Sequence, residues 1–227
     1  MRVRWLTIAI LSFVSALALH AAGPVRPTRL PPVDEAAKDP SFLQFRNELK
    51  DVIARKDAAK LFHYLASDVR VSFGGGSGDY GGPEFHKMWK PFDKDTKVWK
   101  ALGLVVDNGG KLPTPGGFVA PYVYAAWPED LDGFTHVVVT NPQAVLRDAP
   151  NANARVLRKL DHDILEMLKS SGKMQHEAGP NDWGEVKHAS GQRGFVLSSD
   201  VRSPIDYRAI FEQRKGKWVI QTFLAGD

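Results

Sequence analysis

Two short apolar runs on either side of a glycine-containing turn, in residues 182–201 (DWGEVKHASGQRGFVLSSDV), constrain the fold of this chain more than any other feature. Runs of this length are typical of short strands, and Gly191 and Gly194 permit the tight turns that such strands need. We therefore expect a small β unit here, with a compact core supplied by Trp183, Val186, Phe195 and Val196.

The stretch before it, residues 136–170, has two interpretations. In the first, residues 152–169 form a helix, because the apolar positions Val156, Leu157, Leu160, Ile164, Leu165 and Leu168 fit a 3.6-residue period. In the second, a turn at residues 161–163 precedes a strand at residues 164–168. The local pattern alone leaves both interpretations open.

Several short motifs give the segment from about Val137 to Pro204 a likeness to a known domain. They are Val145-Leu146-Arg147, the turn Asp148-Ala149-Pro150-Asn151, Val156-Leu157, Ile164 to Met167, Trp183-Gly184-Glu185-Val186, Gly191 with Gly194-Phe195-Val196, and Leu197 to Val201. In these residues the segment resembles the bacterial Src homology 3-like domain. The resemblance implies a five-strand barrel of about 65 residues and favours the strand interpretation. It departs from the family pattern at Ala149, where the family has Gly, and at the longer insertion 170–181.

The rest of the chain predicts helices and strands. Helical spacing follows Ser41, a candidate N-cap, and a second helix begins near Asp57. A further helix is expected at residues 83–89, and residues 96–106 are either another helix or a passage from helix to strand. Strands are expected at 68–73 and 117–128, the latter interrupted by a proline, and a hairpin at 207–227 turning at Lys215-Gly216-Lys217.

This order resembles the cone-shaped α+β fold of nuclear-transport-factor-like and cystatin-like proteins. The fold class expected is therefore α+β. A small all-β Src homology 3-like barrel, residues 136–204, is inserted in or packed on a helix-plus-curved-antiparallel-sheet unit, residues 41–135 plus 205–227.

The N-terminus predicts export. Arg2 and Arg4 precede an apolar run from Leu6 to Leu19, and small residues follow, so residues 1–22 are expected to be a cleaved signal peptide. The run of about 14 residues is shorter than the ~20 needed to span a bilayer. Residues 23–40 are rich in proline and are expected to form an extended linker. The predicted location is therefore periplasmic or secreted.

Composition and spacing exclude several kinds of site. The chain has no Cys, which excludes disulfides, cysteine nucleophiles and thiolate metal sites. The histidines are scattered without metal-ligand spacing, and the Gly-rich loop 74–82 lacks the Lys-Ser/Thr of a phosphate loop. The net charge of +4 falls to +2 once Arg2 and Arg4 are removed, and no long basic block follows. We expect no metal, no cofactor, no nucleic acid and no stable membrane span, and the sequence predicts no oligomeric state.

Two groups of residues are candidates for function. Trp183, Glu185, Arg193 and Phe195 are the candidate ligand-binding residues of the barrel; Trp183 has an alternative role in packing it. The binding surface would comprise loops 147–155 and 170–182 and the Gly191–Gly194 turn. No sequence motif identifies a catalytic residue. The candidates for acid–base catalysis are His86, Asp79 and Tyr80. The aromatic residues Tyr122, Tyr124 and Trp127 could line the mouth of the cone.

These observations favour an exported, non-catalytic binding or scaffold protein. The resemblance implies that the barrel recognises a cell-wall (peptidoglycan) peptide or a periplasmic protein partner. One alternative is a small-molecule carrier or acid–base enzyme that uses the cone-like unit. Another is an inhibitor that docks through a strand edge.

Overall fold

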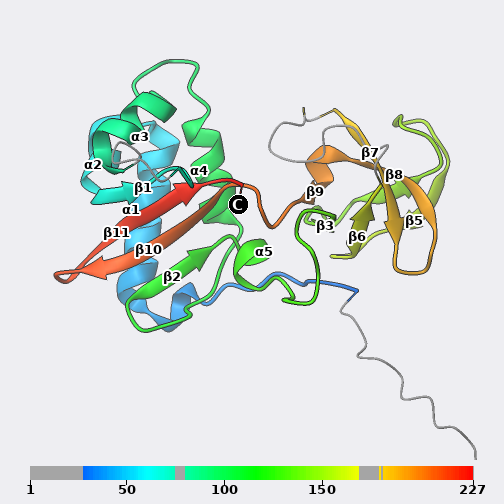
Figure 1. Cartoon of the computed structure of the whole chain (residues 1–227), viewed down its shortest axis with the longest axis horizontal. Coiled ribbons are helices and arrows are strands. Elements are labelled where there is room, and N and C mark those ends of the chain that lie inside the picture. The colour runs from blue at the N-terminus through cyan, green and yellow to red at the C-terminus, as the bar shows by residue number, and fades with distance from the viewer. Residues whose placement is uncertain (1–27, 75–79, 169–178, 180, 227) are drawn as a thin grey trace, which may run out of the picture.

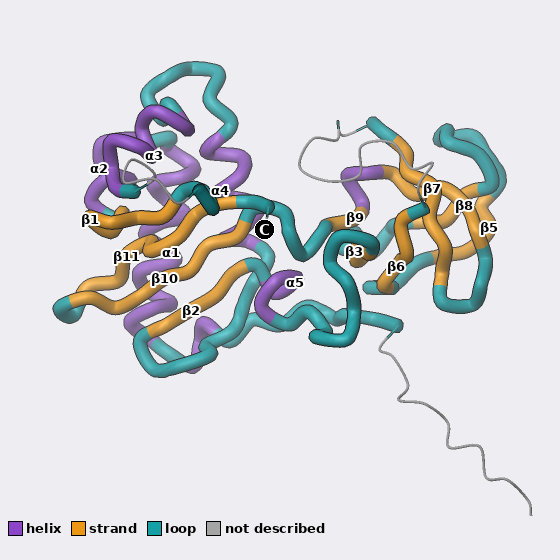
Figure 2. Tube along the Cα trace, in the orientation of Figure 1, coloured by secondary structure: helices purple, strands orange, loops and turns teal. Residues whose placement is uncertain are grey.

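The computed structural model of the chain describes residues 28–74, 80–168, 179 and 181–226. It contains helices and two separate β-sheets (Figures 1 and 2). The α+β class predicted from the sequence is confirmed at this level. The predicted signal peptide lies outside the described residues, as do residues 23–27 of the predicted linker.

The first sheet joins strands from the two ends of the described chain. Its order is β1-β11-β10-β2; β1 runs parallel to β11, and the other pairs are antiparallel. The C-terminal hairpin thus lies between two strands made much earlier in the chain, and the predicted hairpin is confirmed. The strands are β1 (Leu65–Arg70), β2 (Gly117–Ala120), β10 (Arg208–Arg214) and β11 (Lys217–Leu224).

Helix α1 (Pro40–Arg55) covers one face of this sheet. Phe42 stacks on Phe118 of β2 with ring centroids 4.0 Å apart. The N-cap is Asp39, whose carboxylate accepts hydrogen bonds from the backbone N–H of Ser41 at 2.9 Å and of Phe42 at 3.1 Å. The prediction of Ser41 as the N-cap was wrong by two residues, because Pro40 takes the first helical position, to which its fixed φ is suited.

Helices α2, α3 and α4 lie where helices were expected, whereas α5 lies within an expected strand and η1 within the expected linker. Asp57 caps α2 as predicted, since its carboxylate accepts from the N–H of Lys60 at 2.9 Å. A short 3₁₀ turn, η1, precedes α1, and another, η2, lies in the second sheet's part of the chain. The bounds are η1 (Ala36–Lys38), α2 (Ala58–His63), α3 (Gly81–Trp89), α4 (Val98–Asp107), α5 (Tyr122–Ala125) and η2 (Ser198–Asp200).

Two predicted strands have different bounds in the structure. The strand expected at 68–73 is β1, which begins at Leu65 and ends at Arg70. The strand expected at 117–128 ends at Ala120, and the helical turn α5 follows. Pro121 has no N–H to donate to a ladder, which explains why β2 stops before it.

All strands of the second sheet lie within residues 136–202. Its order is β5-β4-β8-β7-β6-β3-β9, with every pair antiparallel. The strand interpretation of residues 152–169 is confirmed, and the helix interpretation was wrong. The strands are β3 (His136–Val139), β4 (Val145–Arg147), β5 (Val156–Lys159), β6 (Ile164–Met167), β7 (Trp183–His188), β8 (Arg193–Leu197) and β9 (Val201–Arg202).

This second sheet is open, so the predicted Src homology 3-like barrel is not confirmed as a closed barrel. Its edge strands, β5 and β9, are not paired with each other. The core on its inner face includes Val186 and Val196, as predicted. Trp183 and Phe195, which were expected in that core, are only half-buried, because strand alternation places them on the opposite face.

Residues 28–35 form a strap across the two sheets. At its start, Thr28 accepts a backbone hydrogen bond from Ile164 of β6 at 2.9 Å. At its end, the N–H of Glu35 donates to the carbonyl of Gly110 at 2.9 Å, beside the helical unit. Figure 1 shows this blue segment running from one unit to the other. The apolar cluster beneath it draws on both units and comprises Leu30, Tyr122, Val123, Leu131, Val138 and Ile164.

Candidate binding face

The four predicted ligand-binding residues lie together on the outer face of β7 and β8. In the antiparallel register, Glu185 is opposite Phe195, Trp183 is opposite Leu197, and Lys187 is opposite Arg193. Residues two apart on a strand point to the same side of a sheet, and so do directly opposite residues. The side chains of Trp183, Glu185, Arg193 and Phe195 therefore share one surface, which we call the β7–β8 face.

Charged groups on the β7–β8 face are matched in pairs. Nη2 of Arg193 lies 2.9 Å from Oε1 of Glu185, and Nζ of Lys187 lies 3.1 Å from Oε2 of Glu166. The side chain of Arg193 is 62% exposed and that of Glu185 is 20% exposed. Ion pairs of exposed side chains contribute little to stability, so the exposed Arg193 can exchange its partner for a group of a ligand.

A glycine on the inner side holds this hairpin close to β4. A Cβ at Gly194 would lie 2.6 Å from the carbonyl oxygen of Arg147 and 2.8 Å from Cγ of Leu146, which is too close for any side chain. Gly191, in the turn, has φ of 86°, a conformation that glycine adopts without strain. The two glycines therefore fix the position of the β7–β8 face relative to the core.

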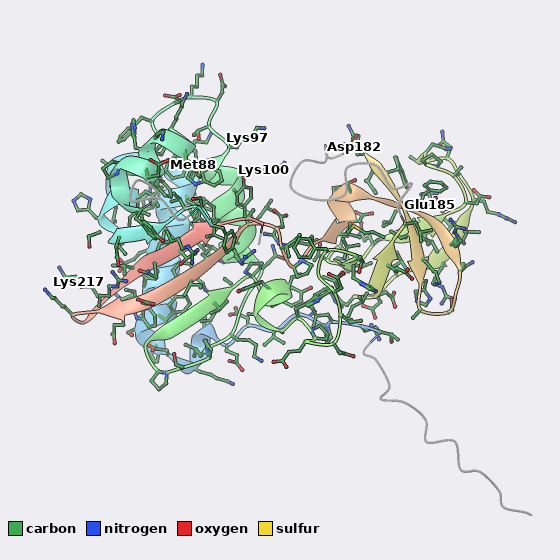
Figure 3. All side chains as sticks on the ribbon, viewed as in Figure 1. Met88, Lys97, Lys100, Asp182, Glu185 and Lys217 are labelled. Atoms are coloured by element: carbon green, nitrogen blue, oxygen red, sulfur yellow. The ribbon has the colours of Figure 1, made fainter. Side chains whose placement is uncertain are left out.

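The residue that precedes β7 connects the strand to its surroundings (Figure 3). The carboxylate of Asp182 accepts a hydrogen bond from the N–H of Gly179 at 2.7 Å, and its carbonyl accepts one from Ser198 at 2.8 Å. These bonds fix the start of β7 against the end of β8. Most of the predicted binding loop 170–182 lies outside the described residues.

The other predicted binding loop, residues 147–155, is held by its own contacts. Nη1 of Arg147 donates to the carbonyl of Ala154 at 2.6 Å, and Nε of Arg155 lies 3.1 Å from Oδ2 of Asp148. Arg147 is also opposite Phe195 in the sheet. This loop therefore flanks the β7–β8 face on its β4 side.

The two catalytic candidates that the structure describes, His86 and Tyr80, are both exposed. His86 is exposed on α3, where its ring centroid lies 5.8 Å from that of Phe92. Tyr80 is 43% exposed just before α3, and Asp79 lies outside the described residues. Tyr122 belongs to the apolar cluster beneath the strap. Neither His86 nor Tyr80 is therefore enclosed, as an acid–base pair inside a cone would be.

Sequence reasoning missed two buried arginines at the junction of the sheets. Arg208 is 5% exposed, and its guanidinium lies 4.6 Å from the ring centroid of Tyr124 and 5.1 Å from that of Phe73. Arg202 donates to the carbonyl of Tyr207 at 2.6 Å, and burial lowers the pKa of its guanidinium. Arginine in a strand normally indicates a solvated face, so the sequence pattern held no signal of their burial.

Within the described ranges, no group of three or more acidic or histidine side chains could hold a metal ion. None of the helices described there is long and apolar enough to cross a membrane. Comparison of the chain with protein-family models, curated proteins and solved structures found no match.

Proposed function

We propose that the protein is an exported, non-catalytic binding protein that recognises its ligand through the β7–β8 face. One observation carries the proposal: Trp183, Glu185, Arg193 and Phe195, the set of candidates named from the sequence, share one surface. The two aromatic side chains are half-buried, so each is held by the fold and still offers part of its ring. We also infer that residues 136–204 form a Src homology 3-like unit. This proposal is supported by the five strands β4 to β8, each of which coincides with one of the motifs that carry the resemblance.

The chemistry of the face suits a cell-wall peptide. Such a peptide carries both carboxylates and amines, and the face offers Arg193 beside Glu185 at 2.9 Å. The aromatic residues add apolar area on which a peptide backbone or a sugar ring can stack. A periplasmic protein with the same mixture of groups would fit the same surface and is the second source of ligand to test.

Co-sedimentation with purified cell-wall sacculi tests the proposal. Residues 23–227 are expected to pellet with sacculi, and Trp183→Ala and Phe195→Ala should each weaken binding by about tenfold, as the loss of an aromatic anchor at the centre of an interface does. Phe134→Ala is the matched control, because Phe134 is 54% exposed and lies outside the β7–β8 face. Circular dichroism shows whether each variant is folded.

Two results would contradict parts of the proposal. If the folded protein stays in the supernatant at every sacculus concentration, the cell wall is not the ligand. If the protein pellets but Trp183→Ala and Phe195→Ala bind as well as Phe134→Ala does, another surface is responsible.

The alternative functions have less support from the geometry. An acid–base role for His86 requires an apolar cavity around it, and His86 is exposed. If His86 were nevertheless catalytic, His86→Ala would abolish turnover. A strand-edge inhibitor of the cystatin-like kind would dock on an open edge of the first sheet. Both edges of that sheet are partly occupied by isolated bridges, at Arg70 with Tyr80 and at Val119 with Lys111.

A further inference from the structure

We propose that a cleft between α3 and α4 is a second binding site, for a small amphiphilic anion. The cleft has a volume of ≈ 780 Å³ and is formed by the end of α3, the loop 90–97 and Tyr207. This volume is within the range of small-molecule sites. The site lies in the other unit from the β7–β8 face and is independent of the function proposed above.

The apolar part of the cleft is anchored to the core of the first sheet. The rings of Trp89 and Tyr207 have centroids 5.0 Å apart, and Tyr207 stacks on Phe223 at 5.7 Å. Phe92 stacks on Phe62 at 5.8 Å while remaining 62% exposed, and Met88 is 46% exposed. The apolar wall of the cleft is therefore preorganised by the core, and it exposes large apolar side chains that a bound ligand would cover.

The rim of the cleft has an excess of positive charge. Lys90, Lys94 and Lys97 line it with Asp93 and Asp95, which leaves one net positive charge. None of these three lysines is in an ion pair with any described residue, although two aspartates are close in the sequence. Other lysines of the chain do form such pairs, among them Lys38, Lys50, Lys87 and Lys187.

The start of α4 adds to this positive potential. Its N-cap, Lys97, makes no side-chain capping bond, and its first turn holds no acidic residue. Lys100 follows in that turn, and Figure 3 shows Lys97, Lys100 and Met88 on the same side of the molecule. Cations are unfavourable at the N-terminal end of a helix, where the macrodipole is positive. An anion bound between these lysines would remove this repulsion.

These features together define the class of ligand. An inorganic anion alone would leave Phe92 and Met88 uncovered, and an uncharged apolar molecule would leave the lysines unpaired. A molecule with one carboxylate, sulfonate or phosphate group on an apolar body satisfies both parts of the cleft.

Isothermal titration calorimetry with three probes tests the assignment. Dodecanoate, below its micelle concentration, is expected to bind at one site. Dodecyltrimethylammonium, which has the same chain and the opposite charge, and inorganic phosphate, which has no chain, should each bind at least about tenfold more weakly. The double variant Lys94→Glu/Lys97→Glu and the single variant Phe92→Ala should each lose dodecanoate affinity by a similar factor.

The matched control is Lys217→Glu, because Lys217 is an exposed lysine at the far end of the first sheet (Figure 3). It should bind dodecanoate as the unmodified protein does, and all variants should keep the same circular dichroism spectrum. The proposal is overturned if dodecanoate does not bind, if the cationic probe binds equally well, or if Lys217→Glu weakens binding as much as Lys94→Glu/Lys97→Glu. Sacculus binding through the β7–β8 face is measured separately, so the two proposals fail independently.

Discussion

Asp39 illustrates how a single side chain sets the start of a helix. Its carboxylate accepts from two backbone N–H groups of the first turn of α1 and from the hydroxyl of Ser41 at 2.7 Å. Asp39→Ala should therefore lower the free energy of unfolding by about 1 kcal/mol. Asp51→Ala, which breaks only an exposed 3.5 Å ion pair with Arg55 in the same helix, should change it by less than about 0.5 kcal/mol. Urea denaturation measures both, and equal losses would contradict the capping role.

The same residue predicts a dependence of stability on pH. Hydrogen bonds from the Ser41 hydroxyl and from backbone amides hold the pKa of Asp39 below its ordinary value of 3.8. The folded state thus binds fewer protons here than the unfolded state, so the contribution of Asp39 is present above pH 3.8 and is lost as the pH falls through the folded-state pKa. The stability gap between the unmodified protein and Asp39→Ala should narrow between about pH 6 and about pH 2. If the difference in stability between the unmodified protein and Asp39→Ala grew as the pH fell, the predicted lowering of the Asp39 pKa would be contradicted.

Two buried tryptophans differ in their hydrogen bonding. The indole N–H of Trp218 donates to Oγ of Ser41 at 2.9 Å, whereas that of Trp89 is buried without a hydrogen-bond partner among the described residues. The two side chains have similar exposure, 6% and 8%. Trp218→Phe should therefore cost about 1 kcal/mol more than Trp89→Phe in chemical denaturation. Equal costs, or a larger cost at Trp89, would show that the hydrogen bond is not the difference.

Among the strands, the packing of β8 against β4 depends on the absence of one side chain. Gly194→Ala places a Cβ against the backbone of Arg147 and the side chain of Leu146, so one strand must move. We expect a loss of about 1–3 kcal/mol, measured by thermal denaturation. Gly226→Ala provides a comparison without steric conflict, because nothing lies within 4 Å of its Cβ position, and its cost should come only from its φ of 90°. A Gly194→Ala variant as stable as Gly226→Ala would contradict the close packing.

How much of each element could be predicted depended on whether its signal is local. The hairpin β10–β11 was predicted because alternation and a turn at Lys215-Gly216 lie side by side in the sequence. The local pattern could not decide between the helix and strand interpretations of residues 152–169. The strand β6 is stabilised by pairing with β3 and β7, and these contacts leave no mark in the local sequence. Only the resemblance, which includes distant motifs, favoured the strands.

The candidate site was predicted in its residues but not in its geometry. The sequence indicated Trp183 and Phe195 as ligand-binding candidates but also as core residues, since large aromatic side chains in short strands are usually buried. The register instead places them with Glu185 and Arg193 on the outer face, and Val186 and Val196 fill the core. The cleft between α3 and α4 left no sequence signal, because it depends on Tyr207, which lies far from the loop 90–97 in the chain.

For the whole molecule, the strap connects the two units. Leu30, 7% exposed, contributes to the apolar cluster that both units share. Leu30→Ala should lower stability by about 2–4 kcal/mol and split the calorimetric transition into two, as the units lose their common core. Leu104→Ala, at a leucine that is 44% exposed, should have little effect. A single sharp transition of unchanged midpoint for Leu30→Ala would show that the strap does not couple the units.

The strand order has a consequence for the sequence of events during synthesis. β1 and β2 do not touch in the first sheet; β11 and β10 lie between them and are the last strands to be made. The apolar side chains of β1 and β2 therefore stay exposed to solvent until β10 and β11 have been synthesised. The second sheet is built from strands that follow one another in the chain. All of its strands are present once synthesis has passed Arg202 and this residue has left the ribosome. We expect the middle of this chain to fold before its beginning, so that the unit started first is the one that depends longest on chaperones.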